Sequence, residues 1–212
     1  MRVAVLGCGV QGRQVALKLA ASDAVSRLIV ADFYPKVAST VASEAGAKAV
    51  AQQVDVTDQK SLAAVLEQVD IVLNTVGPFY KYVRGVVQAA IAQKVNYVDI
   101  NDDYDATEEL FLNPEYDSQA RQAGIIVLSC MGETPGISNV LVRYASEQLE
   151  RVKAVHICFA YTYWRLLPAV WRHMLHCLKG EVTQYLGGRY TKVEAFGGQQ
   201  RIEFLDPVGP RE

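Results

Sequence analysis

A glycine-rich turn between a strand and a helix is the feature that most constrains this chain. The apolar run Val3–Leu6 ends in GCGVQG, and the helical pattern behind it repeats apolar residues four positions apart. In such a turn the first glycine permits a tight bend, the second lets the backbone approach a pyrophosphate, and the third lets helix and strand pack closely. Residues 3–12 therefore predict a dinucleotide-binding turn at the start of an α/β sheet. The residues expected to face the cofactor here are Gly7, Gly9, Val10, Gln11 and Gly12.

An acid at the end of the second apolar run indicates which nucleotide to expect. The run Leu28–Ala31 is followed by Asp32, about twenty residues past Gly12. A carboxylate there accepts hydrogen bonds from a ribose 2′-hydroxyl and repels a 2′-phosphate. We therefore expect NAD, with NADP less favoured, although Lys36 could soften that preference. The alternative is a glycine turn in an α/β protein that binds no nucleotide.

Strand and helix patterns alternate up to about residue 150. Short apolar strands separated by helices predict a parallel sheet covered on both faces. The fold class expected is therefore α/β, with a doubly wound Rossmann sheet over residues 1–150. Further strands of this sheet are predicted at 49–55, 71–73, 97–100 and 125–128. Helix ends are predicted from capping residues at Gly46, Asp58, Asn113 and Gly124.

The pattern changes beyond residue 150. Apolar residues alternate from Val155 to Tyr163, which is typical of a strand with one buried face. A helix is predicted over 168–178, a hairpin with a Gly-Gly turn over 185–190, and a further strand over 201–205. Residues 151–212 are therefore expected to form part of a second, α+β domain with a mixed or antiparallel sheet.

Composition narrows the possible functions. The chain has 212 residues, a net charge of −2 and 50% hydrophobic residues, so we expect no nucleic-acid or membrane partner. The chain opens on a strand, and its four cysteines are scattered, which favours a cytoplasmic protein with reduced thiols and no signal peptide. His173 and His176 have a spacing that can hold a metal, but no further ligand pair supports them, so no metal is expected.

Four loops after predicted strands, at 54–56, 74–81, 99–105 and 131–139, are candidate sites, because ligands of doubly wound sheets bind beyond the carboxyl ends of the strands. Asp55 and Val56 lie where adenine would bind, with helix capping an equal alternative. The loop after the fourth strand suits the nicotinamide, and it comprises Asn74, Thr75, Val76, Gly77 and Pro78. Proton handling or substrate charge is assigned to Tyr80, Lys81, Asp102 and Asp103, since clustered carboxylates raise one another's pKa. For these the alternatives are a solvated lysine and ordinary helix-capping acids.

Six motifs together resemble the saccharopine dehydrogenase-like oxidoreductases. They are VAVLGCGVQG, NTVGPFYKY, NYVDINDDYDAT, GETPGISNVL, and the pair GEVTQYLGG and RIEFLDPVGP. The resemblance implies a Rossmann domain and a second mixed domain. It also implies a nicotinamide-dependent reaction at a C–N bond of an amino-acid-derived substrate, such as saccharopine, lysine or carboxynorspermidine. Relatives continue for well over a hundred residues beyond this end, which implies either a truncated chain or a shortened paralogue, with an incomplete second domain.

Carried over by position, the resemblance places substrate against the loops after Asp99 and Gly132. The substrate-binding residues expected from it are Asp99, Gly132, Pro135, Gly136 and Asn139. A cytoplasmic homodimer is expected. One alternative is a non-catalytic dinucleotide-binding sensor or scaffold. A sugar-nucleotide epimerase or reductase is disfavoured, because the chain has no Tyr-x-x-x-Lys pair.

Overall fold

The computed structural model describes residues 1–160, 168–198 and 200–211, and it divides into two compact units, Met1–Gly136 and Ile137–Glu212. The boundary expected near residue 150 falls within the second unit. The helix α7 (Ile137–Ser146) is counted with that unit and has no buried residue.

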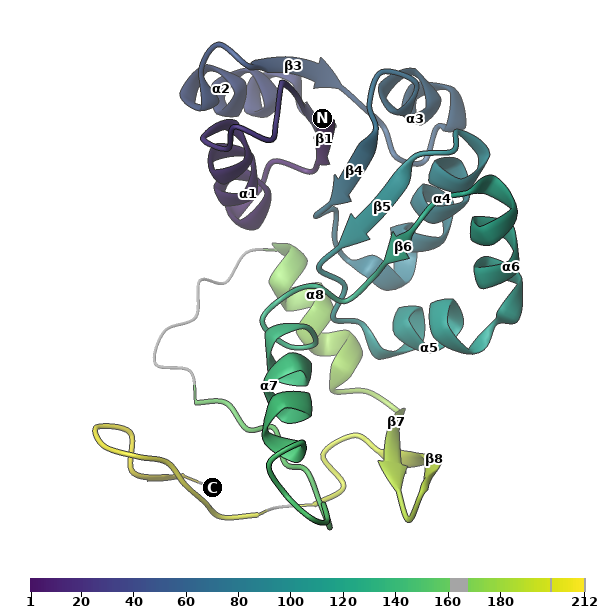
Figure 1. Ribbon diagram of the computed structural model, residues 1–212. Coiled ribbons are helices and arrows are strands. Elements are labelled where there is room, and N and C mark those ends of the chain that lie inside the picture. The colour runs from purple at the N-terminus through teal and green to yellow at the C-terminus, as the bar shows by residue number, and fades with distance from the viewer. Residues whose placement is uncertain (161–167, 199, 212) are drawn as a thin grey trace. The chain divides into compact units, whose positions relative to one another are not determined.

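The first unit is a six-stranded parallel sheet in the order β3-β2-β1-β4-β5-β6 (Figure 1). Its strands are β1 (Arg2–Leu6), β2 (Arg27–Asp32), β3 (Ala49–Gln53), β4 (Ile71–Asn74), β5 (Asn96–Asp99) and β6 (Val127–Leu128). The sheet reverses direction of winding between β1 and β4, where Leu6 is in register with Asn74. This order is that of the doubly wound dinucleotide-binding sheet, so the predicted fold class is confirmed.

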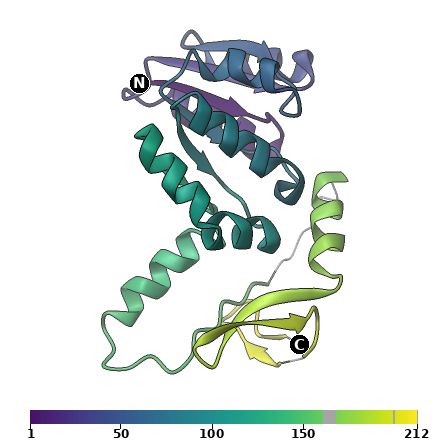
Figure 2. The same cartoon turned by 90° about the vertical axis from the view of Figure 1, so that its right-hand side faces the viewer.

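Helices cover both faces of this sheet (Figures 1 and 2). They are α1 (Val10–Ala20), α2 (Pro35–Ala45), α3 (Gln59–Leu66), α4 (Phe79–Ala92), α5 (Tyr104–Leu112) and α6 (Pro114–Ala123). Successive side chains of a strand point to opposite faces. Val3 and Val5 of β1 accordingly lie in the hydrophobic cluster with α1 and α2, whereas Ala4 and Leu6 lie in the cluster with α3, α4 and α6. Two buried cores on one sheet explain why the central strands β1 and β2 are mostly apolar.

Capping predictions in this unit are confirmed. The Asp58 side chain accepts a hydrogen bond from the Lys60 amide at the start of α3, and Asn113 accepts one from the Glu115 amide at the start of α6. Gly46 and Gly124 follow α2 and α6 with positive φ. The strands at the sheet edges are shorter than expected, since β3 ends at Gln53 and β6 has only 2 residues.

The second unit contains α7, α8 (Pro168–Cys177) and two separate antiparallel pairs. β7 (Glu181–Leu186) and β8 (Arg189–Glu194) form the predicted hairpin, with Gly187 and Gly188 both at positive φ (Figure 2). The predicted strand 201–205 is reduced to β9 (Ile202–Glu203), which pairs with β10 (Pro210–Arg211).

The strand predicted from Val155 to Tyr163 is wrong over its described part. Residues 151–160 have no regular structure, and Val155, Ile157 and Phe159 are exposed. A strand requires a neighbour to satisfy its backbone hydrogen bonds, and no described strand pairs with this segment. Alternation of apolar residues in the sequence was therefore not sufficient to predict a strand here. Tyr161 and Tyr163 lie outside the described residues.

Candidate dinucleotide-binding site

The glycine turn has the backbone geometry that the sequence predicts. Gly7 has a φ of +81°, and a Cβ there would lie 2.9 Å from Val76 Cγ2. A Cβ on Gly12 would lie 1.8 Å from the Gly7 carbonyl oxygen, so the close packing of α1 on the turn excludes any side chain there. Each of these two glycines is therefore required by the fold of the turn itself.

Gly9 differs from both of them, because a Cβ added to it would meet nothing within 4 Å. It is exposed and is the N-cap of α1, where it offers no side chain to accept hydrogen bonds from the first-turn amides. Val10 and Gln11, in that first turn, are exposed as well. A helix N-terminus with open space before it is a site for a phosphate group, because its amides and the helix dipole both favour an anion. The turn thus fits a dinucleotide pyrophosphate.

Two side chains fix the turn in place. The Thr75 hydroxyl, from the loop after β4, donates a hydrogen bond to the Gly7 carbonyl (2.6 Å) and lies 3.0 Å from the Leu6 carbonyl oxygen. The Asp32 carboxylate, at the end of β2, accepts hydrogen bonds from the amides of Cys8 (2.7 Å) and Tyr34 (2.9 Å). The predicted ribose ligand Asp32 is half-buried and lies directly beside the turn.

The structure assigns Asp55 a local role. Its carboxylate accepts hydrogen bonds from the amide and hydroxyl of Thr57, and these bonds lower the pKa of Asp55. Val56 packs against the larger hydrophobic cluster. These contacts lie next to the start of α3, and binding of adenine by Asp55 and Val56 stays a prediction.

The loop after β4 lies beside the glycine turn. Asn74 is buried, Thr75 and Val76 contact the turn, the Gly77–Pro78 peptide is cis, and Pro78 is the N-cap of α4. Of the five predicted nicotinamide-side residues, Asn74 is thus the last residue of β4, the strand adjacent to β1, and the other four follow it. This is the edge at which a doubly wound sheet binds its ligand.

The residues predicted for proton handling are placed differently from one another. Tyr80, Lys81 and Asp102 are exposed, and the Lys81 ammonium lies 5.1 Å from the centre of the Tyr82 ring. Asp103 is buried, and its carboxylate accepts a 3.0 Å hydrogen bond from the Tyr80 amide. The loop after β5 and the start of α4 are therefore joined through Asp103 and Tyr80.

Asp99, predicted to bind substrate, is fully buried. One carboxylate oxygen accepts hydrogen bonds from the amides of Asn101 and Cys130, and the other accepts one from the Tyr97 hydroxyl. The Ser129 hydroxyl lies within 2.9 Å of both oxygens. The carboxylate therefore faces the interior of the first unit and holds the loops after β5 and β6.

Sequence reasoning missed the partners of Asp99. They are Tyr97, Asn101, Ser129 and Cys130, and all four are buried. A signal was available, because Tyr97 and Asp99 are two positions apart in a strand and so point to the same face. Polar residues on one face of a strand that is buried on both sides must find hydrogen-bond partners.

The loop after β6 is tightly folded. Gly132 donates a 3.0 Å hydrogen bond to the Pro135 carbonyl and bridges to Gly136, whose φ is +135°. Asn139 is exposed in the first turn of α7, where its amide oxygen accepts a hydrogen bond from the Ser138 hydroxyl. Gly132, Pro135 and Gly136 thus belong to the first unit and Asn139 to the second.

A pocket of about 200 Å³ lies elsewhere in the first unit, on α4, α5, α6 and the segment joining the last two. It contains none of the predicted site residues. Its lining residues are Arg84, Gln88, Glu109, Asn113, Glu115, Tyr116 and Gln119.

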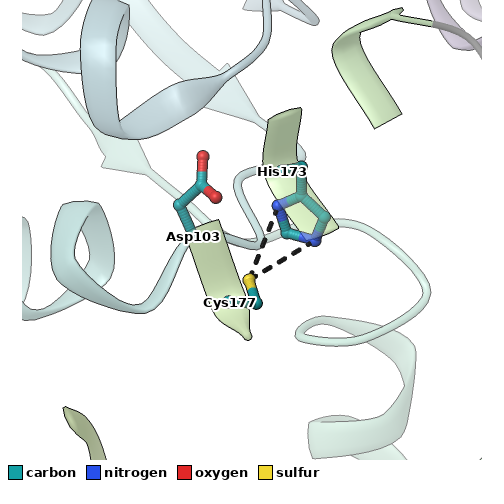
Figure 3. A group of neighbouring side chains, drawn as sticks. All are labelled: Asp103, His173 and Cys177. Atoms are coloured by element: carbon teal, nitrogen blue, oxygen red, sulfur yellow. Dashed lines mark hydrogen bonds between the residues drawn. The ribbon is translucent and has the colours of Figure 1, made fainter. Parts of the chain in front are cut away.

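The histidine pair on α8 is half-buried, as expected for ordinary packed side chains. Cys177 Sγ lies 3.8 Å from His173 Nε2 and 3.9 Å from Nδ1, one helical turn away (Figure 3). Asp103, labelled in the same figure, belongs to the first unit. The His173 and Cys177 side chains supply two of the three or four protein ligands that a zinc site uses.

The sheet order and the glycine turn define a dinucleotide-binding domain of the Rossmann class. Residues 3–128, more than half of the chain, match the family model described as the saccharopine dehydrogenase NADP binding domain. The chain belongs to this family, as its motifs indicated.

Two comparisons extend this result. Apo saccharopine dehydrogenase (L-Glu forming) from Saccharomyces cerevisiae superposes with a TM-score of 0.58 and 29% identity, over 69% of this chain and 31% of that one. A protein from Caenorhabditis elegans described as lipid droplet localized is 33% identical over 78 residues, which are 37% of this chain and 18% of that one. The chain thus spans less than a third of the length of either relative. Among the described residues, no helix is long and apolar enough to cross a membrane.

Proposed function

We propose that this chain binds a nicotinamide dinucleotide at the glycine turn. We further propose that it serves an oxidoreductase acting on a C–N bond of an amino-acid-derived substrate. The observation that carries the proposal is the open space at Gly9, set between two glycines that the fold itself requires. A phosphate can approach the α1 amides only where no side chain intervenes.

Binding of the nucleotide would use the turn and the ends of the neighbouring strands. The amides at the start of α1 would hold the pyrophosphate, and Asp32 would accept hydrogen bonds from the adenosine ribose. Because a carboxylate repels a 2′-phosphate, we propose NAD as the preferred cofactor. The family model is named for NADP, and the exposed Lys36 is the nearest cation in sequence that could accept that nucleotide.

The bound nicotinamide would supply hydride exchange at a carbon atom. This chain's part is to hold that ring against the loop Asn74–Pro78 and to supply groups that handle a proton or bind substrate charge. We propose Tyr80, Lys81, Asp102 and Asp103 for these roles. The Tyr80 backbone amide donates a hydrogen bond to the Asp103 carboxylate, which joins the start of α4 to the loop after β5.

The substrate class rests on the family. The yeast relative is named for saccharopine, and the chain's own motifs resemble enzymes of amino-acid C–N oxidoreduction. Gly132, Pro135, Gly136 and Asn139 are the proposed substrate contacts on the loop after β6. Cytoplasmic location and assembly as a homodimer stay predictions.

Calorimetric titration with NAD and NADP tests the binding step. Gly9→Ser is the informative variant, because its φ of −65° suits any residue and serine is a favoured N-cap. The serine side chain would fill the phosphate approach and compete for the first-turn amides. We expect unchanged thermal stability and at least about tenfold weaker nucleotide binding, equivalent to about 1.4 kcal/mol. Wild-type protein that binds neither nucleotide would overturn the proposal.

A substrate panel tests the reaction. Saccharopine, lysine and carboxynorspermidine-type compounds would be supplied with the nucleotide that binds, and nicotinamide absorbance would be followed. Turnover of one of them supports the oxidoreductase. Binding without turnover favours the alternative, a sensor or scaffold derived from this family.

A further inference from the structure

Three linked hydrogen bonds connect the loop after β4 with β5, and the two between side chains are buried. The Val76 amide donates to Asn74 Oδ1 at 3.0 Å, and Asn74 Nδ2 donates to the Tyr97 hydroxyl at 3.0 Å. The Tyr97 hydroxyl in turn donates to Asp99 Oδ2 at 2.8 Å. Asn74, Tyr97 and Asp99 are each 0% exposed, and Asn74 is in register with Asp99.

The donor-to-acceptor direction of this series of hydrogen bonds is fixed at both ends. A backbone N–H can only donate, so the Val76 amide determines which end of the Asn74 side chain carries the oxygen. A carboxylate only accepts hydrogen bonds, and the other Asp99 oxygen already accepts them from the amides of Asn101 and Cys130. The Tyr97 proton must therefore point to Asp99, and each group has one orientation.

At its Val76 end, this series of hydrogen bonds lies in the loop that contacts the glycine turn. Thr75 donates to the Gly7 carbonyl at 2.6 Å, and Val76 Cγ2 lies 2.9 Å from the position of a Gly7 Cβ. The Asp99 end holds the loops after β5 and β6 through Asn101, Ser129 and Cys130. One buried network therefore connects the cofactor turn with the loops proposed to carry the substrate groups.

We propose that Asn74, Tyr97 and Asp99 are positioning residues that fix the peptide at Val76, at the edge of the nicotinamide subsite. The inference rests on the proposed function, because it requires that a dinucleotide binds at the turn. It concerns only the nicotinamide half of that nucleotide, since the adenosine half would lie on the β2 side. None of the three residues needs to touch the ligand.

The chemistry of Tyr97 supports this role. Burial, and next to it the charge of Asp99, raise the pKa of the Tyr97 hydroxyl well above its usual value. The hydroxyl therefore stays protonated and remains a donor throughout the pH range in which the protein would be studied. Its removal would leave the Asn74 amide without an acceptor in a buried place, which favours rotation of Asn74 and release of Val76.

Tyr97→Phe tests the inference, with two ligands that differ only in the nicotinamide. NADH (or NADPH, if the wild type selects it) contains the ring, whereas ADP-ribose (or its 2′-phosphate) lacks it. We expect about tenfold weaker binding of the reduced dinucleotide, the equivalent of one lost hydrogen bond. Binding of the ring-free ligand should change by less than about twofold, within ordinary variation for a distant site. The fluorescence of bound NADH, which reports the surroundings of the ring, should move toward that of free NADH.

Tyr116→Phe is the matched control. The Tyr116 hydroxyl also donates to a carboxylate, that of Glu109 at 3.2 Å, but it lies on α6 outside the proposed site. This variant should bind both ligands as the wild type does. Asp99→Asn is a second test, because it keeps the side-chain shape but replaces one acceptor oxygen with a donor. The donor-to-acceptor order of the series of hydrogen bonds is then interrupted.

The outcomes separate the two proposals. Wild-type protein that binds no nucleotide overturns both of them. Wild-type binding together with unchanged NADH affinity in both Tyr97→Phe and Asp99→Asn overturns the positioning role alone. Equal losses for NADH and ADP-ribose would also overturn it, as would failure of both variants to fold, since the network would then maintain the domain rather than the subsite.

Discussion

The Asp32 carboxylate accepts a 2.7 Å hydrogen bond from the Cys8 amide, which joins the end of β2 to the middle of the glycine turn. The same carboxylate accepts the Tyr34 amide at 2.9 Å. Asp32 thus has a structural partner on each oxygen before any ribose binds. Its removal should affect both the shape of the turn and the choice of nucleotide.

Asp32→Ala should weaken NAD binding far more than NADP binding. The loss for NAD should be about tenfold or more, since a hydrogen bond to a charged group contributes about 1.5–3 kcal/mol. For NADP, loss of the ribose contact is offset by relief of repulsion with the 2′-phosphate. Calorimetric titration of both nucleotides measures the ratio. Asp32→Asn, which keeps one acceptor oxygen but no charge, is the companion variant. Equal losses for the two nucleotides would contradict the assignment of Asp32.

Gly12→Ala should destabilise the first unit. The new Cβ would lie 1.8 Å from the Gly7 carbonyl oxygen and 2.5 Å from Thr75 Oγ1, so α1 must move away from the turn. We expect a loss of about 2 kcal/mol or more in the free energy of unfolding, typical of overpacking. Gly85→Ala is the control. Gly85 lies inside α4, and a Cβ added there would meet only Gln59 Nε2, at 3.6 Å. That variant should gain about 0.5–1 kcal/mol. Urea unfolding gives both values, and a Gly12→Ala protein as stable as the wild type would refute the packing argument.

Acid should weaken the contact between the starts of β1 and β4. The Arg2 guanidinium and backbone amide donate to Asp70 and hold the pKa of that carboxyl below its usual value. A lowered folded-state pKa contributes stability above the unfolded value of about 3.9, and that contribution disappears as the pH falls through the folded value. Wild type should therefore exceed Asp70→Asn in stability at pH 7 and match it near pH 2. Both groups are about half exposed, so the difference should be small. A gap between the two proteins that persists at pH 2 would rule out this ion pair as its cause.

The cysteines should differ sharply in reactivity. Burial, with a smaller effect of Asp32, raises the pKa of Cys8 to about 12, and burial also raises that of Cys130. Cys158 is exposed. At pH 8, where the thiolate is the reacting species, iodoacetamide should label Cys158 and leave Cys8 and Cys130 unmodified. Mass spectrometry of peptides measures this, with urea-unfolded protein as the control in which every cysteine reacts. Labelling of Cys8 as fast as Cys158 would show that the turn opens readily.

The sequence predicted the first unit well because its strands are buried on both faces. Runs such as Leu28–Ala31 are wholly apolar, so they are readily predicted as buried strands. The glycine turn is compatible with few backbone conformations. Helix ends at Asp58 and Asn113 were predictable because capping is local. These features depend on neighbours in sequence, so a pattern suffices to find them.

The features that the sequence did not predict depend on contacts between residues that are distant in sequence. Alternation over 155–160 indicates a strand only if a partner strand exists, and the described chain offers none there. Asp99 was expected to bind substrate because of the family resemblance, yet its carboxylate accepts hydrogen bonds from Ser129 and Cys130, about thirty residues further along the sequence. Hydrogen-bond satisfaction of that kind is a property of packing, which composition and spacing do not encode.

The glycine turn has a kinetic consequence. With the Gly7 carbonyl held by Thr75 and the Cys8 amide held by Asp32, the turn keeps its shape without help from a nucleotide. A preorganised surface loses little conformational entropy when a ligand arrives. Nucleotide association should therefore follow a single exponential whose rate constant rises linearly with nucleotide concentration, with no plateau from a slow loop closure.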